Sequence, residues 1–231
     1  MSGHSKWSTI KHKKAITDGR KSKQFSKIAA QITISAKRGS DPAMNANLRL
    51  MVEKARAAGM AKDSIERAIK RGTGELGGAA LQQVRYGAIG PGGIAIMIEA
   101  VTDNKNRTIN EVRSTITKFG GKVTEYSSLS YLFEEQGVIT AKGDNEAISL
   151  AAIDAGALDV EENGGVVMVY TASAKMEQVK KSLEAAGATI ESAEISYEPK
   201  STVSTDGPKA QQLLEALDDL DDVTEVYTNL S

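Results

Sequence analysis

Apolar residues in the first third of the chain recur at helical spacing. Three short helices are predicted after about residue 20, each with an apolar stripe that a glycine follows. The three stripes are Phe25, Ile28, Ala29, Ile32 and Ala36, then Leu48, Met51, Val52 and Ala55, and then Ile65, Ala68 and Ile69. Asp41 and Pro42 are typical of a helix start and predict the N-cap of the second helix. Residues 1–75 are therefore expected to form a basic arm and a small helical domain.

Strands and helices alternate after a glycine-rich linker. Strands are predicted at 82–90, 93–102 and 129–133, and Gly90-Pro91-Gly92-Gly93 is typical of the hairpin turn between the first two. A helix is predicted to begin at Thr108, because Thr108 and Glu111 have capping-box spacing.

Residues 137–198 have the order βαββαβ, which is typical of a ferredoxin-like unit. The tail adds one helix and one strand, the pair that 79–134 lacks. The sequence therefore predicts an α+β fold, with an N-terminal small helical domain followed by two ferredoxin-like α+β domains. One of these domains comprises 79–134 plus 201–231, and 137–198 is inserted in it.

Composition narrows the function classes. The 231 residues include no cysteine, which excludes disulfides, thiolate metal sites and a cysteine nucleophile. No apolar run has the length of a membrane span, and no secretory signal follows Met1, so a cytoplasmic protein is expected. Aromatic residues make up 4% of the chain, and base-stacking platforms must therefore be few.

The net charge of −1 conceals an asymmetry along the chain. Residues 1–75 hold 17 Lys+Arg and 6 Asp+Glu, whereas the remaining residues hold 12 and 24. Residues 1–40 alone hold ten Lys+Arg and one acid, a density that favours a polyanion partner. Trp7 could stack on a base or pin the arm to the helices. His4 and His12 are expected to be hydrogen-bond donors to a polyanion rather than metal ligands or catalytic groups.

Three further segments each allow a functional and a plainer interpretation. Lys105 and Arg107 could bind a phosphate at a helix N-terminus, although helix capping alone would explain that segment. The acidic run Asp218, Asp219, Asp221 and Asp222 could hold a hard cation but lacks calcium-loop spacing, which favours a solvated loop. The 137–198 unit lacks the aromatic residues of an RNA-recognition module and holds eleven acids against four bases, which indicates a protein-contacting or spacing domain.

The chain resembles the YebC family, relatives of the mitochondrial translational activator of cytochrome c oxidase subunit one. The matching stretches are Gly3-His4-Ser5-Lys6-Trp7, Ile10-Lys11-His12-Lys13-Lys14, Lys62 to Ile69, Gly90-Pro91-Gly92-Gly93, Thr102 to Thr108, and Ser130-Tyr131-Leu132-Phe133. Two positions depart from the family pattern, with Ala61 where proline is common and Ile89 where an aromatic residue is common.

The resemblance implies three domains and a regulator of gene expression without known enzymatic chemistry. Family members have been described as DNA-binding transcriptional regulators, and others act at the ribosome, where they ease synthesis through proline runs. The residues that it assigns to nucleic-acid contact are Lys6, Trp7, Lys11, His12, Lys13 and Lys14.

The expected function is a non-enzymatic nucleic-acid-binding regulator that uses the phosphates of DNA or ribosomal RNA. The ribosome-associated translation factor is the first alternative, and a carboxylate-based enzyme or a protein-only adaptor is the second. The candidate contact residues are Lys6, Trp7, Lys11, His12, Lys13, Lys14, Arg20, Lys21, Lys23, Lys27, Lys105 and Arg107. No catalytic residue, metal, cofactor or membrane contact is expected, and the oligomeric state is left open.

Overall fold

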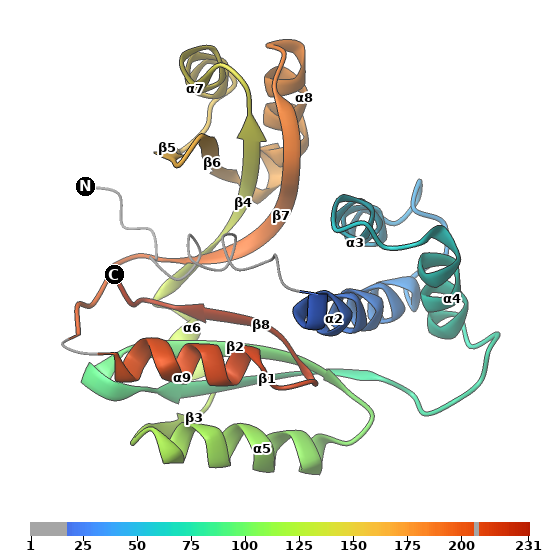
Figure 1. Cartoon of the computed structure of the whole chain (residues 1–231), viewed down its shortest axis with the longest axis vertical. Helices are drawn as coiled ribbons and strands as arrows, with labels where there is room; N and C mark the ends of the chain where they lie inside the picture. Colours follow the sequence, from blue (N-terminus) through green and yellow to red (C-terminus); the bar gives the residue numbers. More distant parts are fainter. Residues whose placement is uncertain (1–17, 206–207) are drawn as a thin grey trace. The chain divides into compact units, whose positions relative to one another are not determined.

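The computed structural model describes residues 18–205 and 208–231. Contacts between residues divide the chain into two compact units (Figure 1). The first unit comprises residues 18–134 and 198–231, and the second unit comprises residues 135–197.

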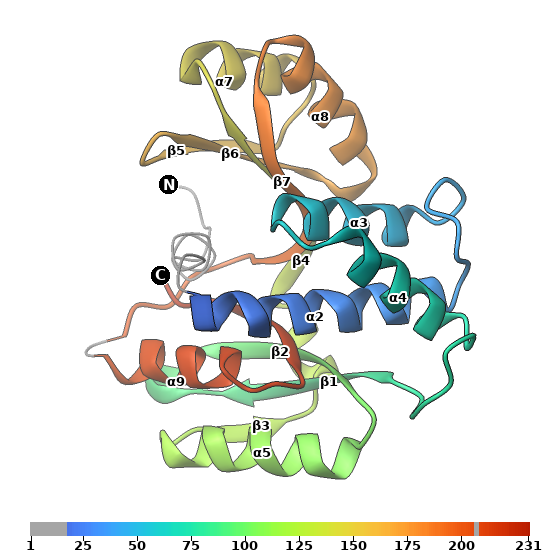
Figure 2. The same ribbon diagram turned by 45° about the vertical axis from the view of Figure 1, so that its right-hand side comes forward.

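Three helices form the helical region of the first unit (Figure 2). They are α2 (Asp18–Ala36), α3 (Ala46–Ala57) and α4 (Lys62–Gly72). Their shared core is aliphatic and consists of Ile28, Ile32, Ala36, Leu48, Val52, Ala55, Ile65 and Ala68. The Thr33 hydroxyl donates to the Ala68 carbonyl over 3.1 Å and ties α2 to α4. Gly72 makes the close approach of these two helices possible, because a Cβ there would collide with the Thr33 carbonyl and the Ala36 side chain.

A four-stranded sheet in the order β3-β1-β2-β8 forms the rest of the first unit. Its elements are β1 (Gln82–Ile89), η1 (Pro91–Gly93), β2 (Ala95–Thr102), α5 (Lys105–Lys118), β3 (Lys122–Thr124), α6 (Ser127–Ser130), α9 (Lys209–Asp218) and β8 (Val223–Thr228). Strand β1 pairs antiparallel with β2 and β3, and β2 pairs antiparallel with β8. The predicted hairpin turn is confirmed, with the Gly90 N–H donating to the Ile94 carbonyl and Gly92 at a φ of 72°.

The central strand β2 is buried along its whole length, so it packs on both faces. On one face, α5 and α9 cover Ile96, Ile98 and Ala100 with an aliphatic core that includes Val112, Leu213 and other leucines. The opposite face of β2 and β8 is in contact with α2. Segments more than 100 residues apart in the sequence therefore share one core.

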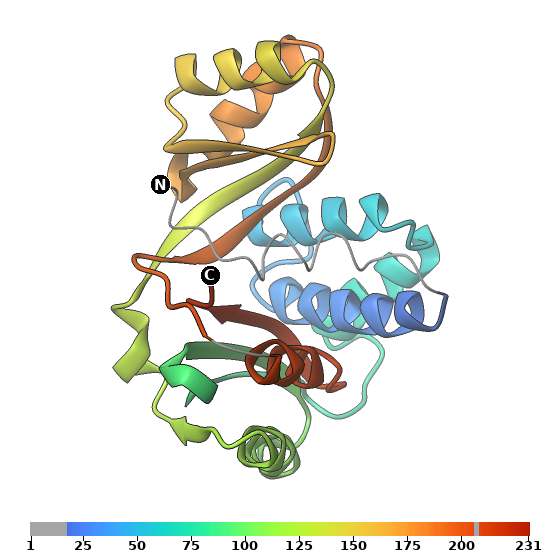
Figure 3. The ribbon, with the colours of Figure 1, turned by 60° about the vertical axis from the view of Figure 1, so that its left-hand side comes forward.

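The second unit has the strand order β5-β6-β4-β7, which is the ferredoxin-like arrangement of a βαββαβ chain (Figure 3). Its elements are β4 (Phe133–Lys142), α7 (Asn145–Asp154), β5 (Asp159–Asn163), β6 (Val166–Ala172), η2 (Ser173–Lys175), α8 (Met176–Ala185) and β7 (Thr189–Pro199). Both α7 and α8 contact β6 and each other, and their buried residues include Ile148, Ala152, Val179 and Leu183. The predicted α+β fold class is confirmed, whereas the exact domain limits stay predictions.

Two predicted helix starts are wrong because another residue provides the cap. Asn45, not Asp41, caps α3 by accepting from the Leu48 N–H over 3.1 Å. Asn104 caps α5 by accepting from the N–H groups of Asn106 and Arg107. Thr108 therefore lies inside the helix, where it is buried.

The strand predicted at 129–133 is also wrong. Residues 127–130 form the short helix α6, and β4 begins at Phe133. Leu129 is buried on α6, and Phe133 is buried as the first residue of β4. The short strand β3, which pairs with β1, was missed.

Candidate nucleic-acid interface

Half of the candidate contact residues lie outside the described part of the chain. These are Lys6, Trp7, Lys11, His12, Lys13 and Lys14. The side chain of Arg20 is likewise outside what is described. The side chains of the other five candidates are described, and they are Lys21, Lys23, Lys27, Lys105 and Arg107.

Two lysines of α2 lie four residues apart and meet the C-terminal end of α9. The Lys23 Nζ donates to the Asp219 carbonyl over 3.0 Å and lies 3.4 Å from the Asp221 carboxylate. The Lys27 Nζ donates to the Asp218 carbonyl and lies 3.5 Å from the carboxylate of the same residue. Cations at a helix C-terminus are stabilising because they complement the helix dipole and the unpaired carbonyls. Lys23 and Lys27 therefore hold α2 against the first sheet.

The segment Asp218–Asp222, called the acidic turn below, has a role that the sequence interpretation did not anticipate. Its residues accept hydrogen bonds or ion pairs from α2 and from α5. Within the described ranges, no group of three or more His, Cys, Asp or Glu residues could hold a metal ion. The solvated-loop interpretation is incomplete, because it left out these contacts.

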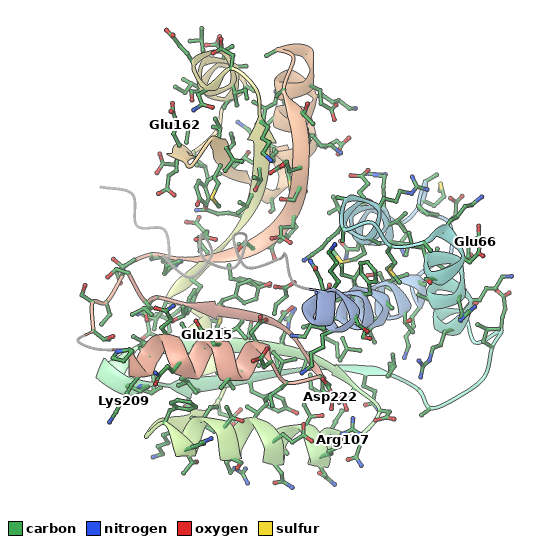
Figure 4. The ribbon with its side chains drawn as sticks, viewed as in Figure 1. Glu66, Arg107, Glu162, Lys209, Glu215 and Asp222 are labelled. Carbon is green, nitrogen blue, oxygen red and sulfur yellow. The ribbon has the colours of Figure 1, made fainter. Side chains whose placement is uncertain are left out.

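Arg107 is paired with the last residue of the acidic turn (Figure 4). Its Nη2 donates to both carboxylate oxygens of Asp222, over 3.0 and 2.8 Å. The hydroxyls of Thr102 and Thr108 donate to the same carboxylate, over 3.0 and 2.7 Å. A phosphate at Arg107 would have to compete with this carboxylate.

The pKa values of this pair follow from these contacts. Burial alone would raise the pKa of Asp222, but hydrogen bonds from Arg107, Thr108 and Thr102 outweigh burial and hold it below its ordinary value. The hydrogen bonds and negative charge of Asp222, with a smaller contribution from Asp103, raise the pKa of Arg107. Both groups are therefore charged at neutral pH.

Lys21 and Lys105 differ from the paired cations. Both are exposed, and neither forms an ion pair with another residue that the structure describes. Lys105 is the first residue of α5, next to the N–H groups that Asn104 caps. Their ammonium groups are open to an incoming anion.

A second polar cluster, also missed from the sequence, lies where α2 and α3 meet the sheet. The Lys54 Nζ lies 2.9 Å from the Glu225 carboxylate, and the Gln31 amide donates to the same group over 3.2 Å. Glu225 pairs across the strands with Glu99, whose carboxylate lies 2.8 Å from the Arg85 Nε. Burial is the main cause that raises the pKa of Glu99, and Glu225 adds to it, while Arg85 opposes both.

Basic residues of α3, of α4 and of the turn after α2 were also missed. They are Arg38, Arg49, Arg56, Arg67, Lys70 and Arg71. Among the described residues, none of these six forms an ion pair. Arg67, Lys70 and Arg71 are exposed together on α4, opposite its buried residues Ile65 and Ala68. The charge count over residues 1–75 was the signal that could have found them.

The second unit offers no comparable cationic surface. Tyr170, the aromatic residue of β6, is fully buried and donates to Glu161 over 3.2 Å, so it presents no face for a base. Apolar exposure is concentrated instead around α7, at Leu150, Ile153 and Leu158. In the described part of the chain, no helix is long and apolar enough to cross a membrane.

These features define an α+β protein whose helical region carries exposed cations. The acidic residues that pair with this region lie on α9, the acidic turn and β8. Two family models match the chain, the TACO1/YebC protein N-terminal domain at residues 5–75 and the TACO1/YebC second and third domain at residues 81–230. The chain belongs to the TACO1/YebC family.

Relatives match the chain over nearly its whole length. A protein of Acidithiobacillus ferrooxidans named "Probable transcriptional regulatory protein" is 47% identical, over 99% of this chain and 94% of that protein. One of the same name from Thermotoga maritima is 46% identical, over 99% and 93%. A solved structure described as a conserved hypothetical protein Aq1575 from Aquifex aeolicus has a TM-score of 0.88 and 42% identity, covering 96% of this chain and 95% of that one.

Proposed function

We propose that this protein is a non-enzymatic regulator of gene expression that binds nucleic acid through its basic N-terminal arm and helical region. The relatives named as probable transcriptional regulatory proteins support the regulatory part. The observation that carries the binding part is the set of exposed cations on α2, α3 and α4 that form no ion pair with described residues.

The physical driving force is electrostatic. Cations that replace condensed counterions on a phosphodiester chain release those counterions, and this release drives binding. In isolation, exposed like charges at this density would repel one another, and a polyanion relieves that repulsion. The arm residues Lys6, Lys11, Lys13 and Lys14 add four positive charges to the same stretch of the sequence.

The proposed contacts differ in how available they are. Lys21 and Lys105 are open, whereas Lys23, Lys27 and Arg107 already have acidic partners within the protein. We therefore assign the main phosphate contacts to the arm, Lys21 and the exposed cations of α3 and α4. The sequence has no evident helix with Asn, Gln or Arg side chains in the outward-facing array of a DNA-reading helix, which favours recognition of phosphates and shape.

Salt titration of binding tests the proposal. The full chain is titrated with a 30-base-pair mixed-sequence DNA duplex and with purified ribosomes at several salt concentrations. If the arm covers about six phosphates, the log–log slope is expected to be about −4 to −5. Replacement of Lys11, Lys13 and Lys14 by alanine should flatten the slope by about two to three.

The two nucleic-acid targets give different results in this titration. Sequence-selective DNA binding that persists at high salt would support promoter DNA and defeat the ribosomal version. Tight binding to ribosomes with weak, unselective DNA binding would support ribosomal RNA and the translation alternative. No binding to either at low ionic strength would overturn the proposal.

A further inference from the structure

The lysines of α2 that the sequence assigns to phosphates are already occupied by acceptors of a similar kind. Lys23 and Lys27 each meet one backbone carbonyl and one carboxylate of the acidic turn. Phosphodiester oxygens are also hydrogen-bond acceptors with negative charge, so the turn and a nucleic acid would use the same two ammonium groups. The two contacts therefore compete for the N–H donors and the positive charge of the same lysines.

We propose that the acidic turn is an autoinhibitory element that competes with nucleic acid for Lys23 and Lys27. This inference rests on the proposed function, because it concerns the regulation of that same surface. In the free protein the turn lowers the affinity for phosphates, and a nucleic acid must displace its carboxylates to gain these two contacts.

The two ion pairs differ in exposure, which indicates that a nucleic acid displaces one more easily than the other. The side chains of Lys23 and Asp221 are 51% and 83% exposed, whereas those of Lys27 and Asp218 are 13% and 35% exposed. Exposed ion pairs contribute little to stability in water, so the Lys23 pair exchanges readily. The more buried Lys27 pair resists, and it requires a ligand that presents several phosphates close together.

Helix capping alone does not account for the carboxylates. The carbonyls of Asp218 and Asp219 at the end of α9 already accept from the two lysines and would satisfy a purely structural contact. The carboxylates add charge at the same place. Replacing Asp by Asn at 218 and 221 keeps the backbone carbonyls and removes only this charge, which makes the competition measurable in a folded protein.

The test compares two double variants of the full chain that change net charge equally. Asp218→Asn with Asp221→Asn removes the two carboxylates that pair with α2. Asp154→Asn with Glu184→Gln removes two exposed acids of the second unit and serves as the matched control. Binding to the 30-base-pair duplex and to ribosomes is measured between about 50 and 200 mM salt, the range in which counterion release changes affinity strongly.

The turn variant is expected to bind about three- to tenfold more tightly at 0.1 M salt, with a log–log slope steeper by about one to two. The control should bind within about twofold of the unmodified protein. Adding Lys23→Gln and Lys27→Gln to the turn variant should remove the gain, because these two ammonium groups are its source.

Three results would overturn the inference. The first is an equal gain in the turn variant and the control, which would indicate an effect of net charge alone. The second is a gain that persists without the two lysines, which would indicate relief of general repulsion. The third is no gain while the unmodified protein binds. Failure of every variant to bind either nucleic acid would instead refute the proposed function.

Discussion

The helical region and the second unit are similar in length and opposite in charge. Residues 18–75 hold 13 Lys+Arg and 6 Asp+Glu, whereas residues 135–197 hold 4 and 11. Both bury an aliphatic core, with Ile28, Ile32 and Leu48 in one and Ile139, Ile148 and Leu183 in the other. The buried positions determine how each part folds and leave the exposed positions free to differ. The two parts therefore present surfaces of opposite charge.

The helical region also divides its cations between two uses. Lys23, Lys27 and Lys54 pair with acids of α9, the acidic turn and β8. Arg67, Lys70 and Arg71 form no ion pair within the described chain. The first set joins the helices to the sheet, and the second set is exposed to solvent.

The largest effect is expected from removing the unpaired set. Replacing Arg67, Lys70 and Arg71 by alanine should weaken binding to the 30-base-pair duplex or ribosomes about 100-fold at 0.1 M salt and flatten the slope by about two to three. The matched control replaces Lys175, Lys180 and Lys181 of the second unit, an equal change in charge, and should change affinity by less than about threefold. Equal losses of affinity in both variants would contradict the difference between the helical region and the second unit. Circular dichroism checks that α4 persists.

The next effect tests the packing of the helical region alone. Gly72→Ala should destabilise it by about 1–3 kcal/mol, because the new methyl group collides with the Thr33 carbonyl. Gly59→Ala is the control for steric collision, because a Cβ at Gly59 meets no atom within 4 Å. Its φ of 83° adds backbone strain, so this variant tests strain without a collision. Thermal unfolding and hydrogen exchange of α2 and α4 measure the difference. A Gly72→Ala variant as stable as the parent would contradict the close approach.

Two neighbouring acids should respond in opposite directions to removal of charge. Glu225→Gln weakens the contact with Lys54 and should lower stability at pH 7 by about 1–2 kcal/mol. Burial raises the pKa of Glu99, so the charged form of this residue costs stability as pH rises above that pKa. Glu99→Gln should therefore raise the free energy of unfolding at pH 7 by about 1 kcal/mol or less, which is measured as a higher melting temperature. The gain should vanish near pH 4. Equal destabilisation by both variants would contradict this assignment.

The smallest effect concerns acid stability at Asp222. Because the folded-state pKa of this carboxyl is lowered, its contribution is present above its unfolded pKa of about 3.9 and is lost as pH falls through the folded value. Asp222→Asn should cost less than about 1 kcal/mol at pH 7, and the difference from the parent should disappear at the acid end of a pH series. A difference that grew on acidification would be the wrong sign.

The sequence predicted the fold class because apolar periodicity and glycine positions agree in most segments. Ile65, Ala68 and Ile69, for example, mark one face of α4 at helical spacing. The helix starts failed where two candidate caps stood close together, since Asn45 and Asn104 replaced Asp41 and Thr108. Choosing between such residues requires the backbone geometry, which sequence does not contain.

The candidate surface was only partly accessible to sequence reasoning. Charge density identified the basic arm and helical region, but it could not reveal that Lys23 and Lys27 meet residues nearly 200 positions away. Pairing between distant segments depends on the tertiary fold. The unpaired cations of α3 and α4 were overlooked because their density along the chain is lower than that of the first forty residues.

The position of β8 at the edge of the first sheet, next to β2, has a consequence for how the protein is made. This strand and α9 complete the core around Ile96 and Ile98, yet they follow the second unit in the chain and leave the ribosome after it. During synthesis the second unit can close on itself, whereas the first remains open until α9 and β8 have emerged. A premature stop or a cleavage near residue 208 would thus leave a basic fragment with an uncovered apolar sheet, a substrate for chaperones and proteases.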